Sequence, residues 1–376
     1  MTVYKFPAGS LTRLRHSASG DPTSVWREVP TGEKKPDGTD VTKTVYTGDK
    51  LAKTLGGICD DFVMVGGLRF HPTAPTVAAP ALRAEWTKLL GHMNAAKVQL
   101  SVGIAPQPMT KDTDVFNDFV FGKDALTEDP GFARCAKALV ELMDRELPGW
   151  AGLSFDIEHI HIRDPQTGTV PTPNRRAEAI FECRDRLTLF YQAVCIAAHP
   201  RMVPIIAGAK IDANHCFVHA AGHKVPAPIF AVVHDWTKIT ALPNSTLLAM
   251  AYDGDPGRGA EGRLRWHRDT ITYATTTNTD PDDRPMIHPS KFQLLIKTGK
   301  SLKPGEPGML VTSSEIEARM ALAREFSVGI CYFPGVPVNA AEYEKQLNTN
   351  GGAPKPGATN NQPYQHPIAD VTKTFP

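Results

Sequence analysis

Three polar residues alternate along one short apolar stretch near the middle of the chain. The segment from Trp150 to Ile162 reads WAGLSFDIEHIHI and places Ser154, Asp156 and Glu158 at every second position. Successive side chains of a β-strand point to opposite faces, so these three would share one face. Two carboxyls this close repel each other when both are ionised, so one would hold its proton up to near-neutral pH. The spacing therefore indicates a candidate general acid.

The same acids also allow a purely structural interpretation. Asp156 could cap a loop, and Glu158 could form an ion pair with Arg163 or Arg184. An ionised carboxylate buried in an apolar run is unfavourable unless it is paired, so such a pairing is physically reasonable. The spacing of the acids alone leaves both roles open.

Apolar runs of strand length alternate with longer segments of helical spacing over most of the chain. One example is the run Lys97–Ile104, and another is the helical pattern of Pro130–Leu147. Strands that alternate with helices of this length predict βαβ units and a parallel sheet. Seven such strands follow from residue 61 onward, and Val3–Phe6 could supply an eighth. We therefore expect an α/β fold of the (β/α)8 TIM-barrel class, with inserted loops and an extended C-terminal tail.

The expected barrel occupies residues 1–347, with insertions near 7–56, 105–129 and 254–290. Residues 348–376 are rich in Pro, Gly and Asn, which predicts an extended strap or a docking arm for a protein partner. A doubly wound open sheet is the rival architecture. Neither GxGxxG after a first strand nor a GxxxxGK[ST] loop occurs, so the usual nucleotide sites of that fold lack support.

The strand ends carry a resemblance to a known family. The segment Ala151–Glu158 resembles the DGxDxDxE signature of the fourth barrel strand in glycoside hydrolase family 18, the chitinases and endo-β-N-acetylglucosaminidases. The last Asp and the Glu match, while Ala151 and Ser154 replace the first two Asp residues. Met250–Asp253 resembles the MxYD that ends the sixth strand of the family, and Lys97–Gly103 resembles its third-strand segment. The resemblance spans roughly residues 58–335.

The resemblance implies substrate-assisted retaining hydrolysis of β-linked N-acetylhexosamine glycans. Glu158 would protonate the leaving glycosidic oxygen as general acid. Asp156 would hydrogen-bond the acetamido N–H and stabilise the cyclised cation, whose nucleophile is the acetamido oxygen of the sugar itself. Tyr252 would position that oxygen, and Asp253 would line the same sugar subsite. No cofactor is expected for such a reaction.

The last strand should present an aromatic platform for the sugar, and Tyr332 and Phe333 are the candidates. Ser154 could hydrogen-bond Asp156, although it carries no charge to raise the pKa of that group. Trp236 could also stack a sugar, but we expect it to pack in the core. The two replaced aspartates favour an alternative function: a non-hydrolytic, chitinase-like barrel that binds sugars or serves as a structural component of a larger assembly.

Histidine spacing suggests two further features. His215, His219 and His223 recur every four residues and could hold zinc, but no HExxH pattern accompanies them, so we expect a polar surface or a pocket wall and no metal site. His159 and His161 flank the candidate acid. One could tune it, since imidazole titrates near pH 6.5, or both could pack between strand and loop.

The composition limits the partners and the location of the chain. Its 376 residues carry a formal net charge of +1 without a basic block, so neither nucleic acid nor a membrane is an expected partner, whereas a glycan is. The N-terminus lacks an apolar signal-peptide region, so we expect a cytoplasmic protein as encoded, or export by a non-classical route. The six cysteines form no CxxC pair, so buried free thiols are expected, although their spacing leaves a disulfide open.

Overall fold

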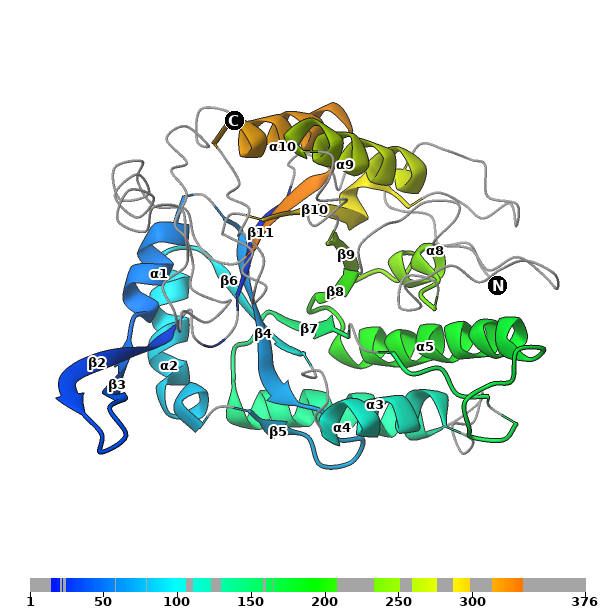
Figure 1. Cartoon of the computed structure of the whole chain (residues 1–376), viewed down its shortest axis with the longest axis horizontal. Coiled ribbons are helices and arrows are strands. Elements are labelled where there is room, and N and C mark those ends of the chain that lie inside the picture. Colours follow the sequence, from blue (N-terminus) through cyan, green and yellow to red (C-terminus); the bar gives the residue numbers. More distant parts are fainter. Residues whose placement is uncertain are drawn as a thin grey trace.

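Eight parallel strands form a closed ring at the centre of the molecule (Figure 1). The computed structural model describes residues 15–20, 22, 25–57, 59–78, 80–105, 111–122, 130–157, 160–164, 166–207, 233–250, 259–275, 287–297 and 313–333. In order round the ring the strands are β1 (His16–Gly20), β4 (Asp61–Arg69), β6 (Gln99–Ile104), β7 (Gly152–Asp156), β8 (Val203–Ala207), β9 (Ser245–Ala249), β10 (Phe292–Lys297) and β11 (Gly329–Phe333).

The ring closes because β1 pairs in parallel with both β11 and β4. Ser17, for example, lies in register with Cys331 on one side and with Asp61 on the other. This closure confirms the (β/α)8 barrel and rules out the open sheet. The short strand β5 (Thr76–Val77) adds an antiparallel edge to β4 outside the ring.

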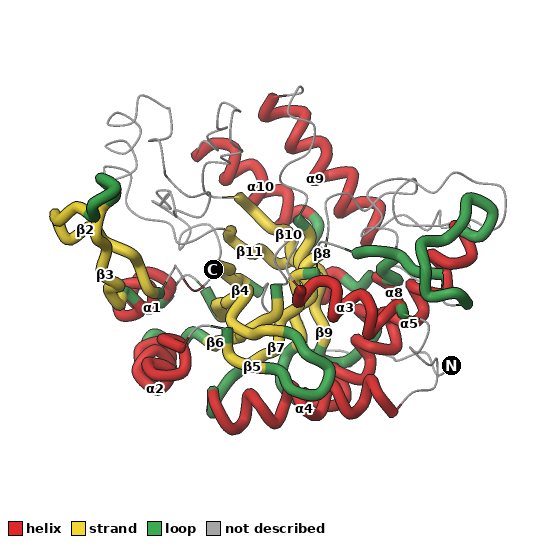
Figure 2. Tube along the Cα trace, turned by 60° about the horizontal axis from the view of Figure 1, so that its bottom comes forward, coloured by secondary structure: helices red, strands yellow, loops and turns green. Residues whose placement is uncertain are grey.

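Helices surround the ring on its outer face, as Figure 2 shows for the red segments around the yellow strands. They are α1 (Gly48–Leu55), α2 (Pro80–Ala95), α3 (Lys111–Phe121), α4 (Pro130–Glu146), α5 (Arg176–Ala198), α8 (Trp236–Thr240), α9 (Gly259–Thr275) and α10 (Ser313–Glu325), with a 3-10 turn at η3 (Pro289–Lys291). Helix α2 buries Leu82, Trp86, Leu89 and Met93. Steps of three and four residues place these side chains on one face of the helix, which turns toward the barrel.

Two separate apolar clusters hold the barrel together. The larger cluster fills the layer between strands and helices and includes Leu153 and Phe155 of β7. The smaller cluster lies inside the ring and consists of Val63, Val65, Ile206, Leu248, Leu295 and Cys331. Side chains that alternate along each strand supply the two clusters in turn, as expected for a packed barrel.

Serine and glycine face each other across β6 and β7. Ser101 is in register with Gly152, and Gly103 is in register with Ser154. A Cβ on Gly152 would lie 2.5 Å from Ser101 Oγ, and a Cβ on Gly103 would lie 2.7 Å from Ser154 Cβ. Each serine therefore occupies the space that its glycine partner leaves empty, and this brings the two strands together inside the barrel.

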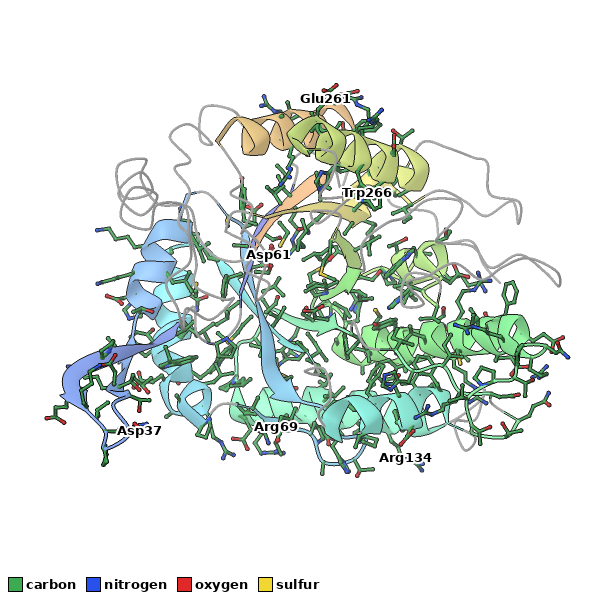
Figure 3. The ribbon with its side chains drawn as sticks, in the orientation of Figure 1. Asp37, Asp61, Arg69, Arg134, Glu261 and Trp266 are labelled. Atoms are coloured by element: carbon green, nitrogen blue, oxygen red, sulfur yellow. The ribbon has the colours of Figure 1, made fainter. Side chains whose placement is uncertain are left out.

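The N-terminal end of the ring is filled by a polar network around Asp61, which Figure 3 labels near the barrel strands. Asp61 is 1% exposed and accepts hydrogen bonds from Arg15 and Ser17. Ser17 Oγ also contacts Gln293 Oε1 at 2.8 Å. A buried carboxylate is stable only when it is paired in this way. Since barrel active sites lie at the opposite end, we assign this network to stability.

Several differences from the sequence-based expectations concern the inserted segments. The first barrel strand is His16–Gly20, inside the range 7–56 that the sequence predicts to be an insertion. Val3–Phe6 lies outside the described residues. The same range holds the exposed antiparallel hairpin of β2 (Trp26–Lys34) and β3 (Asp40–Tyr46), which extends beside α1 in Figure 1. Helices α3 and α9 fall in the ranges 105–129 and 254–290. The tail, 348–376, lies outside the described residues.

The described thiols agree with the expectation of unpaired cysteines. Five cysteines are free and buried, and the sixth, Cys216, lies outside the described residues. None of the described helices combines the length and the apolar character that are needed to cross a membrane.

Candidate functional site

Strand β7 turns Ser154 and Asp156 toward the inside of the barrel. Its other side chains, Leu153 and Phe155, pack in the outer layer, and the Phe155 ring lies 5.6 Å from that of Phe190 on α5. Because side chains alternate along a strand, Ser154 and Asp156 face the opposite way. Asp156 is the last residue of the strand, so it lies at the carboxyl end of the ring, where barrel enzymes bind their substrates.

The surroundings of Asp156 combine apolar neighbours with partial exposure to solvent. Asp156 is in register with Ile206 of β8, which belongs to the interior cluster. Met250, which follows β9, and Ala105, which follows β6, pack against the same cluster. Asp156 as a whole residue is half-buried, and its Oδ1 atom is fully buried. A carboxylate above an apolar floor interacts strongly with a nearby developing charge, because little water screens it.

Ser154 lies one step deeper and is completely buried. Among the described residues its hydroxyl has no hydrogen-bond partner, so the hydrogen bond that Ser154 could have made with Asp156 is not observed. The Ser154 side chain fits there because Gly103, which faces it, has no side chain.

Tyr191 of α5 lies near Asp156 in the layer behind β7. Its ring packs 5.5 Å from that of Phe155, and the whole side chain is buried. Burial raises the pKa of the Tyr191 phenol, and the negative charge of Asp156 raises it further. Within the described part of the chain the phenol oxygen has no hydrogen-bond partner. The proximity of Tyr191 to Asp156 was not foreseen from the sequence, since the residue belongs to an apolar helix face.

Other residues predicted for the site fall outside the description. Glu158, Tyr252 and Asp253 are not among the described residues, and neither is the side chain of Phe333. Their roles stay predictions.

The structure contradicts the prediction that the Tyr332 ring forms a platform for the sugar. Tyr332 is 0% exposed and packs in the outer cluster, in register with Ala18 of β1. Its neighbour Cys331 faces the interior instead, as alternation along the strand requires. Burial raises the pKa of the Tyr332 phenol. A ring enclosed between strands and helices cannot stack on a sugar at the mouth of the barrel.

Trp236 packs in the core, as expected. It is 4% exposed, and its ring stacks on that of His234 at 4.2 Å and 3°. Asp235 caps the N-terminus of α8 by accepting a hydrogen bond from the backbone N–H of Lys238. The His234 ring also stacks on that of Tyr191 of α5, with centroids 6.0 Å apart, so this cluster joins α8 to α5.

The loop after β7 is anchored at several points. Ile160 and Ile162 are each 7% exposed, while His161 between them is exposed and its backbone N–H donates to Asn117 Oδ1 at 2.8 Å. Arg163 forms an ion pair with Asp118 at 3.7 Å. The contact of His161 with Asn117 joins residues 44 positions apart, which no local sequence pattern could indicate.

No metal site is found among the described residues, where no group of three or more histidine, cysteine or acidic side chains converges. His215, His219 and His223, predicted to form a polar surface or a pocket wall, lie outside the described residues, as does His159.

Comparisons with known proteins give structural likenesses only. No family model matches the sequence, and no curated protein matches it. One similar solved structure is the GH18 chitinase from Cycas revoluta in complex with (GlcNAc)3, with a TM-score of 0.46, 12% identity and coverage of 85% of this chain and 94% of that chain. Another is the lactosyl-enzyme intermediate of endo-glycoceramidase II from Rhodococcus sp., with a TM-score of 0.43, 12% identity and coverage of 90% and 76%. The closed ring of strand pairings within this chain defines its fold.

Proposed function

We propose that this barrel is a glycoside hydrolase that cleaves β-linked N-acetylhexosamine glycans, with Glu158 as the general acid. The observation that supports the proposal is the order of the ring. Counted from β1, the strand with Asp156 is the fourth, the strand before Tyr252 and Asp253 is the sixth, and the strand with Ser101 is the third. This is the order in which the family 18 signatures occur.

In the proposed mechanism the carboxylate of Asp156 stabilises the positive charge of the cyclised sugar. Its carboxyl lies inside the carboxyl end of the barrel above apolar side chains, where an electrostatic interaction is stronger than in water. Asp156 would hold the acetamido N–H and so orient the acetamido oxygen toward the anomeric carbon. Glu158, two residues later in the sequence, would protonate the leaving oxygen. Tyr252 would orient the acetamido oxygen, and Asp253 would bind the same sugar.

The experiment that tests the function is product release from a panel of N-acetylglucosamine-containing polymers and glycans. Glu158→Gln keeps the shape of the side chain but removes its proton, and general acid catalysis typically contributes about 10²–10⁴-fold. We therefore expect turnover to fall by about that factor while substrate binding persists. The matched control is Glu141→Gln, which changes an exposed glutamate on the outer helix α4 and should leave turnover unchanged.

Asp156→Asn tests the substrate-assisted step separately. The amide cannot stabilise a positive charge, so substrates with a 2-acetamido group should lose most of their turnover. A thiazoline analogue of the cyclised sugar should inhibit the unmodified protein. If the unmodified protein binds sugars from the panel but releases no product, a sugar-binding or structural barrel is the better explanation.

A further inference from the structure

Helix α3 is an additional helix in the connection between β6 and β7, which also contains α4. It is fixed to α5 at its C-terminal end, where Arg186 Nη1 donates to the carbonyl oxygen of Gly122 at 2.6 Å. The ring of Phe116 on α3 meets that of Phe190 on α5 edge to face at 5.6 Å. Figure 1 shows α3, α4 and α5 along the same side of the barrel. Helix α3 therefore has a firm base on the helix that follows β7.

Asn117 of α3 connects this base to the loop that leaves β7. Its side chain is 0% exposed, and its Oδ1 accepts the backbone N–H of His161 at 2.8 Å. A buried amide is destabilising unless it is hydrogen-bonded, so a wholly buried asparagine requires such contacts. His161 lies three residues after Glu158 in the sequence. The contact thus fixes the backbone on the far side of the proposed acid.

A second contact holds the same loop from α5. The thiol of Cys183 donates to the carbonyl oxygen of Arg163 at 3.3 Å. Burial raises the pKa of Cys183 to about 12, so the thiol keeps its proton over the working pH range. Ile157, before the proposed acid, and Ile160, after it, are 2% and 7% exposed. The described chain is therefore anchored on both sides of Glu158.

We propose that Asn117 is a positioning residue that holds the loop after β7, the loop to which Glu158 belongs in the sequence. This inference rests on the proposed function of Glu158. A displacement of a catalytic group by about 1 Å can lower turnover by about 100-fold, so one buried hydrogen bond at the base of the loop has a large effect on rate.

The first test measures kinetics and stability of Asn117→Ala. We expect kcat to fall by about 10- to 100-fold with KM changed by less than about 3-fold, because the acid and not the substrate is displaced. Asn117→Asp retains an oxygen that can accept the N–H of His161, so it should recover part of the lost kcat. The control is Asn94→Ala, at an exposed position of α2, which should behave like the unmodified protein.

The second test does not depend on turnover. In protein labelled with ¹³C at the glutamate carboxyls, the signal of Glu158 is the one that Glu158→Gln removes. Asn117→Ala should change the apparent pKa of Glu158, because it changes the surroundings of that carboxyl. If Asn117→Ala does not fold, Cys183→Ala removes the other contact to the loop and should change the same pKa.

The two tests separate the two proposals. If the unmodified protein cleaves none of the panel, the hydrolase function fails, and the titration alone decides whether Asn117 positions Glu158. If Asn117→Ala folds and leaves both kcat and the titration of Glu158 unchanged, the positioning role is refuted. A fall in melting temperature without either change would refute it as well, since that result describes an ordinary packing residue.

Discussion

Gly103 and Ser154 lie directly opposite each other across β6 and β7, with the serine side chain filling the space where a glycine Cβ would be. A Cβ on Gly103 would lie 2.7 Å from both Cβ and the carbonyl oxygen of Ser154. Asp156 follows two residues later on the same face. The strand that carries the candidate site is therefore packed so tightly that its neighbour tolerates only glycine.

Gly103→Ala should destabilise the barrel for this reason. Overpacking of a dense interior typically costs about 1–3 kcal/mol, so we expect that loss in the free energy of unfolding, measured by urea denaturation. Gly91→Ala is the control, because a Cβ there would meet no described atom within 4 Å and Gly91 lies on the exposed face of α2. There we expect a gain of about 0.5–1 kcal/mol. Equal effects at both positions would contradict the packing described for β6 and β7.

Asp61→Asn should weaken the N-terminal end of the barrel. The change removes the charge that pairs with Arg15 but keeps the shape, and we expect a loss of about 2 kcal/mol in the free energy of unfolding. The loss is smaller than for a fully buried pair because the Arg15 side chain is 26% exposed. Asp40→Asn breaks the exposed pair of Lys34 and Asp40 and should cost less than about 1 kcal/mol. A larger loss at Asp40 than at Asp61 would refute this ranking.

Burial of Lys291 should make the free energy of unfolding depend on pH. Lys291 is 8% exposed, and burial lowers its pKa from 10.5 to about 8, although its ammonium donates to the carbonyl oxygens of Leu242, Pro243 and Ser245. Between these pKa values the unfolded chain binds more protons than the folded chain. The contribution of Lys291 to the free energy of unfolding should therefore rise with pH above about 8.

The measurement compares the unmodified protein with Lys291→Met by chemical denaturation at a series of pH values. We expect the stability difference to shift in favour of the lysine by about 2 kcal/mol between about pH 8 and about pH 10. Lys88→Met, at an exposed position, should show no such trend. The opposite result would be a stability difference that moves against the lysine as pH rises. It would mean that the three contacts with carbonyl oxygens stabilise the charged ammonium more than burial destabilises it.

Tyr191→Phe should stabilise the protein. The change removes only a hydroxyl that is buried and, within the described structure, has no hydrogen-bond partner. Removing an unsatisfied buried polar group typically gains about 1 kcal/mol, which a rise in melting temperature would report. Tyr332→Phe should have the same effect, because the Tyr332 hydroxyl is also buried without a hydrogen-bond partner in the described structure. A loss of stability in Tyr191→Phe alone would show that this hydroxyl is hydrogen-bonded in solution.

Much of the barrel could be predicted from local patterns. Apolar runs such as Lys97–Ile104 indicated strands, and the spacing in Pro130–Leu147 indicated a helix, because burial repeats with the period of each element. The inward direction of Ser154 and Asp156 followed from the same alternation. The resemblance of the strand ends to family 18 placed those strands in an order that the ring reproduces.

The first strand escaped prediction for a physical reason. His16–Gly20 has the sequence HSASG, with no apolar run, because its alternate positions Ser17 and Ser19 belong to the inside of the barrel and Ala18 needs little space outside. Its strand structure depends on pairing with β4 and β11, which are distant in sequence.

The sequence by itself determined the type of most elements and which residues share a face, because these depend on neighbours within a few positions. Only the tertiary structure decided which contacts join distant segments, such as Asn117 with His161 and Arg15 with Asp61. It also decided that Tyr332 is enclosed by the outer layer and cannot stack on a sugar. Such contacts depend on how the ring closes and where each helix packs, and those are properties of the whole chain.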